Sequence, residues 1–69
     1  MLNSNNGKEA ILHYLANDYE VIKPGQFVTC AVTGKTIPLQ DLKYWSAALQ
    51  EPFIDAHAAE VRYRETGEI

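Results

Sequence analysis

Residues 26–37 decide the fold, and they read QFVTCAVTGKTI. Val28, Cys30 and Val32 alternate with side chains that would face the other way, which is the two-residue period of a half-buried β-strand. Gly34 then provides a residue that accepts the left-handed conformation of a tight turn. The predicted boundaries are 26–32 for the strand, 33–35 for the turn and 36–37 for a short return strand.

The sequence upstream of this hairpin allows two interpretations. Residues 9–16 form either a helix capped by Asn6 or a strand with Ala, Leu and Tyr on one face. Helix propensity favours the first, but the segment 17–23 reads NDYEVIK and combines a turn signal with a β-rich run at hairpin distance. Pro24 and Gly25 mark the next turn. We therefore predict a strand over 9–16 that pairs with residues 19–23.

Downstream of Pro38 the pattern changes from strand to helix. Residues 38–42 suit a single helical turn, and Ser46 is a candidate N-cap for a C-terminal helix. Pro52 would lie inside a helix that starts there, so the helix either kinks at Pro52 or begins near Gln50. The predicted helix body is 53–63, and Gly67 is expected to end the ordered part of the chain near the tail. Its apolar arc consists of Leu49, Phe53, Ile54, His57 and Val61, with Ala58, Ala59 and Arg62 outside it.

These elements predict an α+β fold, in which a small antiparallel β-meander of three to four strands is followed by a C-terminal helix packed on the sheet. The chain has 69 residues and therefore holds at most one domain. The expected organisation is a flexible N-terminal arm over 1–8, a single small domain over 9–64 and an acidic C-terminal tail over 65–69.

Composition excludes several classes of protein. With 46% hydrophobic and 22% charged residues the chain is of ordinary globular composition, and a single Cys excludes an intrachain disulfide framework. The net charge is −3 and all of it falls after Leu49, which argues against nucleic-acid binding and allows an acidic docking surface on the helix. No apolar run reaches the length of a membrane span, so we expect no membrane partner. A core this small seldom supplies more than about 3–5 kcal/mol, which favours association with another chain.

Cys30 is the candidate residue with the most chemical alternatives. Its first interpretation is a buried small apolar side chain, and the others are a nucleophile or a metal ligand. The segment from Cys30 to Lys35 has the outline of a zinc-ribbon knuckle in which Val32 and Thr33 stand where a second thiolate belongs. A degenerate metal site would use Cys30 with His57 and His13, but three ligands of this kind are too few for zinc without a further donor. We expect no cofactor.

The remaining candidates are aromatic or titratable residues near the predicted helix. Tyr44 and Trp45 follow a lysine and form either a stacking platform or core packing. His57 lies one helical turn before Glu60, so the two form either a ligand with its orienting group or a base with an acid. The alternative is a hydrogen-bonded, partly buried histidine. Phosphate-binding loops, nucleophile elbows and metalloprotease motifs are missing from the sequence, and we therefore expect a protein that is not an enzyme.

The segments at 27–39, 42–46 and 50–51 together resemble a family of short uncharacterised bacterial proteins, mostly alphaproteobacterial, classed as a domain of unknown function. The shared core is V-x-C-A-V-T-G-x-x-I-P-L, then L-x-Y-W-S, then Q-E, and the resemblance extends over most of residues 9–60. Pro52 departs from the family pattern. The resemblance implies a cytoplasmic bacterial protein and marks a set of fold-defining or binding residues. This set is Cys30, Thr33, Gly34, Tyr44, Trp45, Ser46, Gln50 and Glu51, to which the apolar arc adds His57.

We expect the protein to be a small non-enzymatic module that binds another protein, and the partner can be a second copy of the same chain. The acidic helix or the corner formed by Tyr44 and Trp45 would provide the contact surface.

Overall fold

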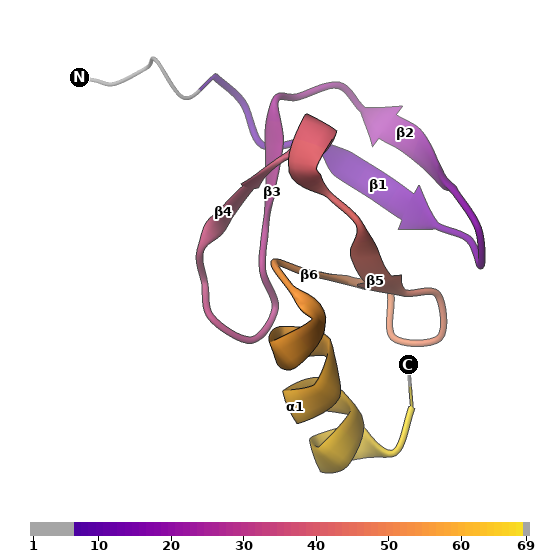
Figure 1. Ribbon diagram of the computed structural model, residues 1–69. Helices are drawn as coiled ribbons and strands as arrows, with labels where there is room; N and C mark the ends of the chain where they lie inside the picture. Colours follow the sequence, from indigo (N-terminus) through magenta and orange to yellow (C-terminus); the bar gives the residue numbers. More distant parts are fainter. Residues whose placement is uncertain (1–6, 69) are drawn as a thin grey trace.

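The computed structural model describes residues 7–68, and in this part of the chain three β-hairpins are followed by one helix (Figure 1). All three hairpins are antiparallel and each is a separate two-stranded sheet. The strands are β1 (Ile11–Tyr14), β2 (Tyr19–Lys23), β3 (Phe27–Thr29), β4 (Thr36–Pro38), β5 (Tyr44–Ser46) and β6 (Glu51–Phe53). A 3₁₀ turn, η2 (Leu39–Asp41), precedes β5, and helix α1 (Ala56–Thr66) follows β6. The α+β prediction is confirmed, although the described strands number six in three pairs rather than three to four in one meander.

The first two hairpins form where the alternation of the sequence predicted them. β1 confirms the strand interpretation of residues 9–16, since it pairs with β2. Leu12 and Tyr14 are buried in the core, while Ile11 and His13 face solvent. β3 is shorter than predicted, because the chain turns after Thr29 instead of after residue 32. Gly34 has a φ of 75°, the left-handed conformation expected of the turn.

Gly25 allows the first two hairpins to approach each other closely. A Cβ at this position would overlap with the backbone N of Ala10 and the backbone O of Lys8. The N–H of Ala10 donates to Phe27 O at 2.7 Å, and the N–H of Gln26 donates to Lys8 O at 2.8 Å. Lys8, which the sequence placed in the N-terminal arm, is therefore bonded to the body of the protein. Residues 1–6 of that arm lie outside the described residues.

The C-terminal helix begins later than predicted, because residues 44–53 form a third hairpin. Ser46 is not a helix N-cap: it ends β5, and its Oγ accepts from the N–H of Leu49 at 2.9 Å within the turn. Pro52 neither kinks nor starts the helix but lies in β6, where its fixed φ suits an extended backbone. Asp55 is the N-cap, since its side chain accepts from the N–H of Ala58 at 2.8 Å.

This later start also changes the buried face of the helix. Phe53 is fully buried, but from β6, and His57, predicted on the apolar arc, is exposed in the first turn. Ala58, predicted outside the arc, is the residue of α1 that is buried. The helix packs on β5 and β6, ends at Gly67, and extends through Thr66 into the segment expected as a tail. The core therefore lies between the hairpins and the face of α1 that bears Ala58.

None of the helices in the described part of the chain has the length and apolar character needed to cross a membrane.

Candidate functional site

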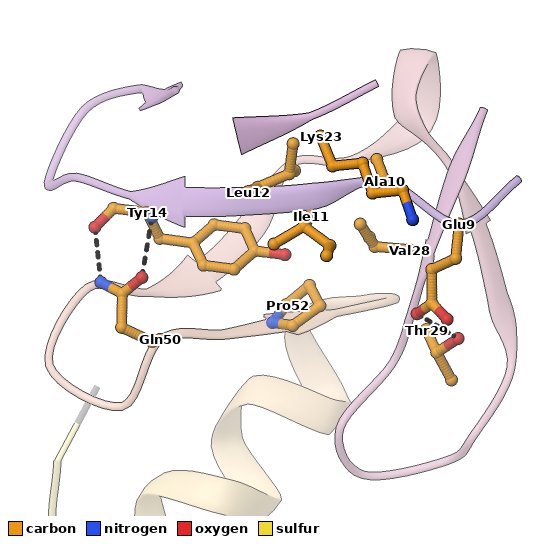
Figure 2. A pocket seen from close by; sticks show the side chains of 10 residues that line it. All are labelled: Glu9, Ala10, Ile11, Leu12, Tyr14, Lys23, Val28, Thr29, Gln50 and Pro52. Carbon is orange, nitrogen blue, oxygen red and sulfur yellow. Dashed lines mark hydrogen bonds between the residues drawn. The ribbon is translucent and has the colours of Figure 1, made fainter. Parts of the chain in front are cut away.

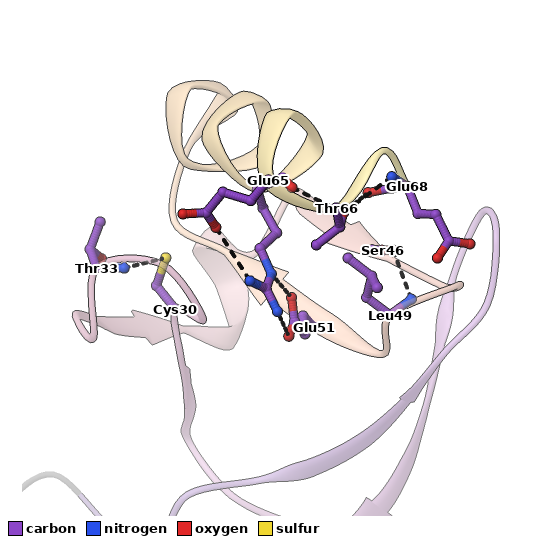
Figure 3. A network of polar contacts seen from close by, with 9 residues as sticks. Cys30, Thr33, Ser46, Leu49, Glu51, Glu65, Thr66 and Glu68 are labelled. Carbon is purple, nitrogen blue, oxygen red and sulfur yellow. Dashed lines mark hydrogen bonds and ion pairs between the residues drawn. The ribbon is translucent and has the colours of Figure 1, made fainter.

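The side chain of Cys30 lies in the interior, directly after β3, with 2% of the residue exposed. Its Sγ accepts from the backbone N–H of Thr33 at 3.5 Å and from that of Ile54 at 3.4 Å, and Figure 3 shows the first of these contacts. Burial opposes ionisation of the thiol, but the hydrogen bonds from the side chain and backbone of Thr33 and from Ile54 outweigh it and lower the pKa of Cys30 below its usual value. The thiol of Cys30 therefore joins the turn that contains Thr33 to the start of the segment that leads into α1.

The three residues of the alternative metal site are not brought together. His13 lies on the outer face of β1, where its Nδ1 is 3.0 Å from Glu20 Oε1, while His57 is exposed on α1 and Cys30 is buried. Across residues 7–68 no group of three or more His, Cys, Asp or Glu side chains has an arrangement that could hold a metal ion. The pairing of His57 with Glu60 is also not formed, since the carboxylate of Glu60 accepts from Arg64 at 3.0 Å.

Because the thiol is enclosed, we expect Cys30 of the folded protein to react with iodoacetamide about a hundredfold or more slowly than Cys30 of the urea-unfolded chain. A buried group reacts through opening of the structure, whatever its pKa. Mass spectrometry of time points at neutral pH measures both rates. Equal rates would mean an accessible thiolate and would support the nucleophile hypothesis.

Trp45 is part of the packing between the first and third hairpins. Its Nε1 donates to Leu15 O at 2.7 Å, and its ring meets Tyr19 edge to face with centroids 5.6 Å apart. Tyr44, the neighbouring candidate, is exposed. Of the two rings predicted as a stacking platform, that of Trp45 packs against other side chains and that of Tyr44 faces solvent. The indole N–H of Trp45 already has a hydrogen-bond partner.

The acidic helix surface is largely neutralised by two arginines. Arg62 binds Glu51 through Nε at 2.9 Å and Nη2 at 3.0 Å, and its Nη1 lies 3.3 Å from Glu65 (Figure 3). Arg64 pairs with Glu60 in the same helix. Glu51, a predicted site residue, thus joins β6 to α1, and this side of the molecule offers a basic partner less free negative charge than the sequence suggests.

Gln50 has the most specific geometry of the predicted residues. Its side-chain amide faces the backbone of Tyr14: the N–H of Tyr14 donates to Gln50 Oε1 at 2.9 Å, and Gln50 Nε2 donates to Tyr14 O at 2.7 Å (Figure 2). The amide therefore bonds to the edge of β1 as a neighbouring strand would. The backbone of Gln50 holds a φ of 57°, which is uncommon for any residue other than glycine.

Next to this bridge is a cavity of about 510 Å³ that is open to solvent between β1 on one side and β3 and β6 on the other (Figure 2). Its walls are apolar around Val28 and Pro52, and Glu9, Tyr14, Thr29 and Lys23 provide polar groups. Neither Glu9 nor Tyr14 is among the site residues predicted from the sequence. The alternation of β1 places Tyr14 on the same face as Ala10 and Leu12, but no local pattern indicates a cavity there.

Two side chains of the cavity are arranged for hydrogen bonding. Tyr14 is 5% exposed and its hydroxyl points into the cavity (Figure 2). Burial, together with the negative charge of Glu9, raises the pKa of Tyr14 to about 12, so the phenol is a neutral donor at physiological pH. Thr29 Oγ1 donates to Glu9 Oε2 at 3.0 Å and orients that carboxylate.

Comparison with known proteins places this chain in a family. Searches of curated proteins and of solved structures each found no match. The family model described as "Uncharacterized protein conserved in bacteria (DUF2093)" matches residues 21–62, which is more than half of the chain and includes the β3–β4 and β5–β6 hairpins. The resemblance to an uncharacterised bacterial family is thereby confirmed, and the chain belongs to the DUF2093 family.

Proposed function

We propose that this protein is a small non-enzymatic interaction module that associates with a second copy of itself through the β1–β2 hairpin. The observation that supports this proposal is the surface of the hairpin. Four of the six large hydrophobic residues exposed in the described part of the chain lie there: Ile11, Leu15, Val21 and Ile22, with Val21 53% and Ile22 64% exposed.

The outer edge of β2 is the strand edge that suits this association. β2 pairs with β1 alone, and its side chains from Glu20 to Lys23 are all exposed. In an antiparallel strand, successive residues direct their backbone groups to opposite edges. The N–H of Leu15 donates to Asp18 O, so Asp18 directs its backbone toward β1 and begins the β1–β2 ladder. Val21, three residues later, therefore directs its N–H and C=O to the outer edge. Such an edge pairs readily with another strand.

A second copy is the occupant that the sequence of β2 favours. Antiparallel pairing centred on Val21 places the two Val21 side chains opposite each other and sets each Tyr19 opposite the Lys23 of the other copy, so no like charges are directly opposed. A chain of 69 residues with no intrachain disulfide gains the apolar burial that its own core lacks. A free buried cysteine is compatible with a reducing compartment, and the cytoplasm is part of the same proposal.

Light scattering over a concentration series tests the association. We expect the weight-average mass to rise above the 7.8 kDa of one chain as the concentration increases. Val21→Lys places like charges opposite each other and is expected to weaken the self-association by about tenfold or more. Tyr63→Lys is the matched control, because Tyr63 is equally exposed but lies on α1. A wild-type protein that remains monomeric at about 1 mM, or equal effects of the two substitutions, would overturn the proposal.

A further inference from the structure

The inner edge of β1 has a gap in its hydrogen bonding at Leu12. Ala10, Leu12 and Tyr14 are alternate residues and therefore direct their backbone groups to the same edge, away from β2. At one end the N–H of Ala10 bonds to β3, and at the other end Tyr14 bonds to the amide of Gln50. Among the described residues no hydrogen bond across this edge reaches Leu12, and Leu12 lines the cavity described above.

The gap accommodates one peptide unit and not a longer strand. β3 closes the edge of β1 at Ala10, and Gln50 closes it at Tyr14. The N–H and C=O of Leu12 can therefore pair with the carbonyl and amide groups of a single residue, after which the bound chain must turn away toward solvent. Gln50 demonstrates within the same structure that one amide group is sufficient to bond a residue of β1 on both backbone atoms.

The side chains of the cavity indicate a cationic residue. Thr29 occupies Oε2 of Glu9, and no hydrogen bond within the described residues involves Oε1. The hydroxyl of Tyr14 has no hydrogen-bond partner among these residues either, although the residue is more than nine-tenths buried and directed into the cavity. The carboxylate of Glu9 and the neutral phenol of Tyr14 line the same cavity from different ends (Figure 2). A long cationic side chain that lies across the cavity can form charge-assisted hydrogen bonds with both.

We propose that this cavity binds one basic residue of a partner peptide, whose peptide groups pair with Leu12 and whose cation binds Glu9 and the hydroxyl of Tyr14. Apolar contacts with Val28 and Pro52 cover the methylene groups of the bound side chain. The site lies on the inner edge of β1 and is separate from the β2 edge proposed for self-association. It would give the module a second, sequence-selective contact.

Lys23 is the group that opposes this binding. It lines the rim of the cavity, and its ammonium group has the same charge as the proposed ligand. It forms no ion pair with Glu9 within 4.0 Å. Removing this charge is therefore expected to strengthen the binding of a cation, whereas a site for an anion would be weakened by the same change.

The test uses N-acetyl-arginine N-methylamide as the probe in an amide NMR titration of the full chain. We expect saturable shifts at the amide of Leu12 and at its neighbours Ala10 and Thr29. N-acetyl-citrulline N-methylamide has the same length and shape without the charge, and it is expected to bind about tenfold more weakly. Binding of both probes with equal affinity, or shifts that do not saturate, would overturn the proposal.

Three variants locate the binding site. Glu9→Gln removes the charge from an exposed side chain and retains an oxygen that can accept from Thr29, and it should lower the affinity for the arginine probe to that of the citrulline probe. Tyr14→Phe retains the ring and should weaken binding to a smaller degree. Lys23→Gln should strengthen it, and weakening would contradict a cation site. Glu20→Gln, on the outer face of the same hairpin, is the matched control and should have no effect.

The result is independent of the proposed function. Self-association is measured by mass at increasing concentration, and the probe titration is performed on the Val21→Lys variant if the wild type associates. Loss of one property with the other retained would therefore identify which proposal fails.

Discussion

Phe53→Ala is expected to unfold most of the protein at room temperature. Phe53 is fully buried at the end of β6, between the third hairpin and the rest of the core. Removal of a buried phenylalanine side chain costs about 3–5 kcal/mol, and the whole stability of a core of this size is about 3–5 kcal/mol. Urea titration followed by circular dichroism, at one fixed protein concentration, measures the loss.

Two further variants make this result specific to the core. Phe53→Leu retains most of the apolar volume and should remain folded with a reduced midpoint. Tyr63→Ala removes an exposed aromatic ring from α1 and should change the free energy of unfolding by less than about 0.5 kcal/mol. A loss below about 1 kcal/mol for Phe53→Ala would show that β6 is not part of the core.

Gln50→Ala is expected to reduce the free energy of unfolding by about 2 kcal/mol, because both backbone groups of Tyr14 lose their partner. Gln50→Gly loses the same two hydrogen bonds but relieves the backbone at φ 57°. The glycine variant should therefore be more stable than the alanine variant by about 1 kcal/mol.

The same urea titration separates the two contributions. Gln40→Ala, an exposed glutamine in η2, is the control and should be close to neutral. Equal stability of the alanine and glycine variants would show that the left-handed conformation carries no cost. No loss in either variant would show that the bridge to β1 adds nothing to folding.

The parts of the fold that sequence reasoning predicted correctly are governed by neighbouring residues. The alternation of β1 and β3, the turn at Gly34 and the 3₁₀ turn after Pro38 all depend on interactions within a few positions. The predicted start of the helix is wrong because the apolar residues Phe53 and Ile54 fit the arc of a helix as well as they fit a strand and the turn after it. The apolar pattern reveals neither the positive φ of Gln50 nor the cap that Asp55 provides.

The candidate site was less accessible to sequence reasoning, because its contacts join distant segments. The bridge between Gln50 and Tyr14 spans 36 positions, and the contact of Trp45 with Leu15 spans 30. The family motif marks Gln50 as a site residue, but no local pattern links it to β1. Glu9, Tyr14 and the free edge at Leu12 were missed for the same reason, since a cavity is a property of packing.

The edge of β2 is followed directly by Pro24, which has no N–H to donate. A ladder that grows along β2 from a neighbouring molecule therefore stops within the five residues of that strand. When two copies pair through their β2 edges, neither copy retains a free β2 edge for a third molecule, and the assembly is closed at two members. The exposed strand that would form the dimer is therefore not available for further strand addition, which opposes the growth of fibres.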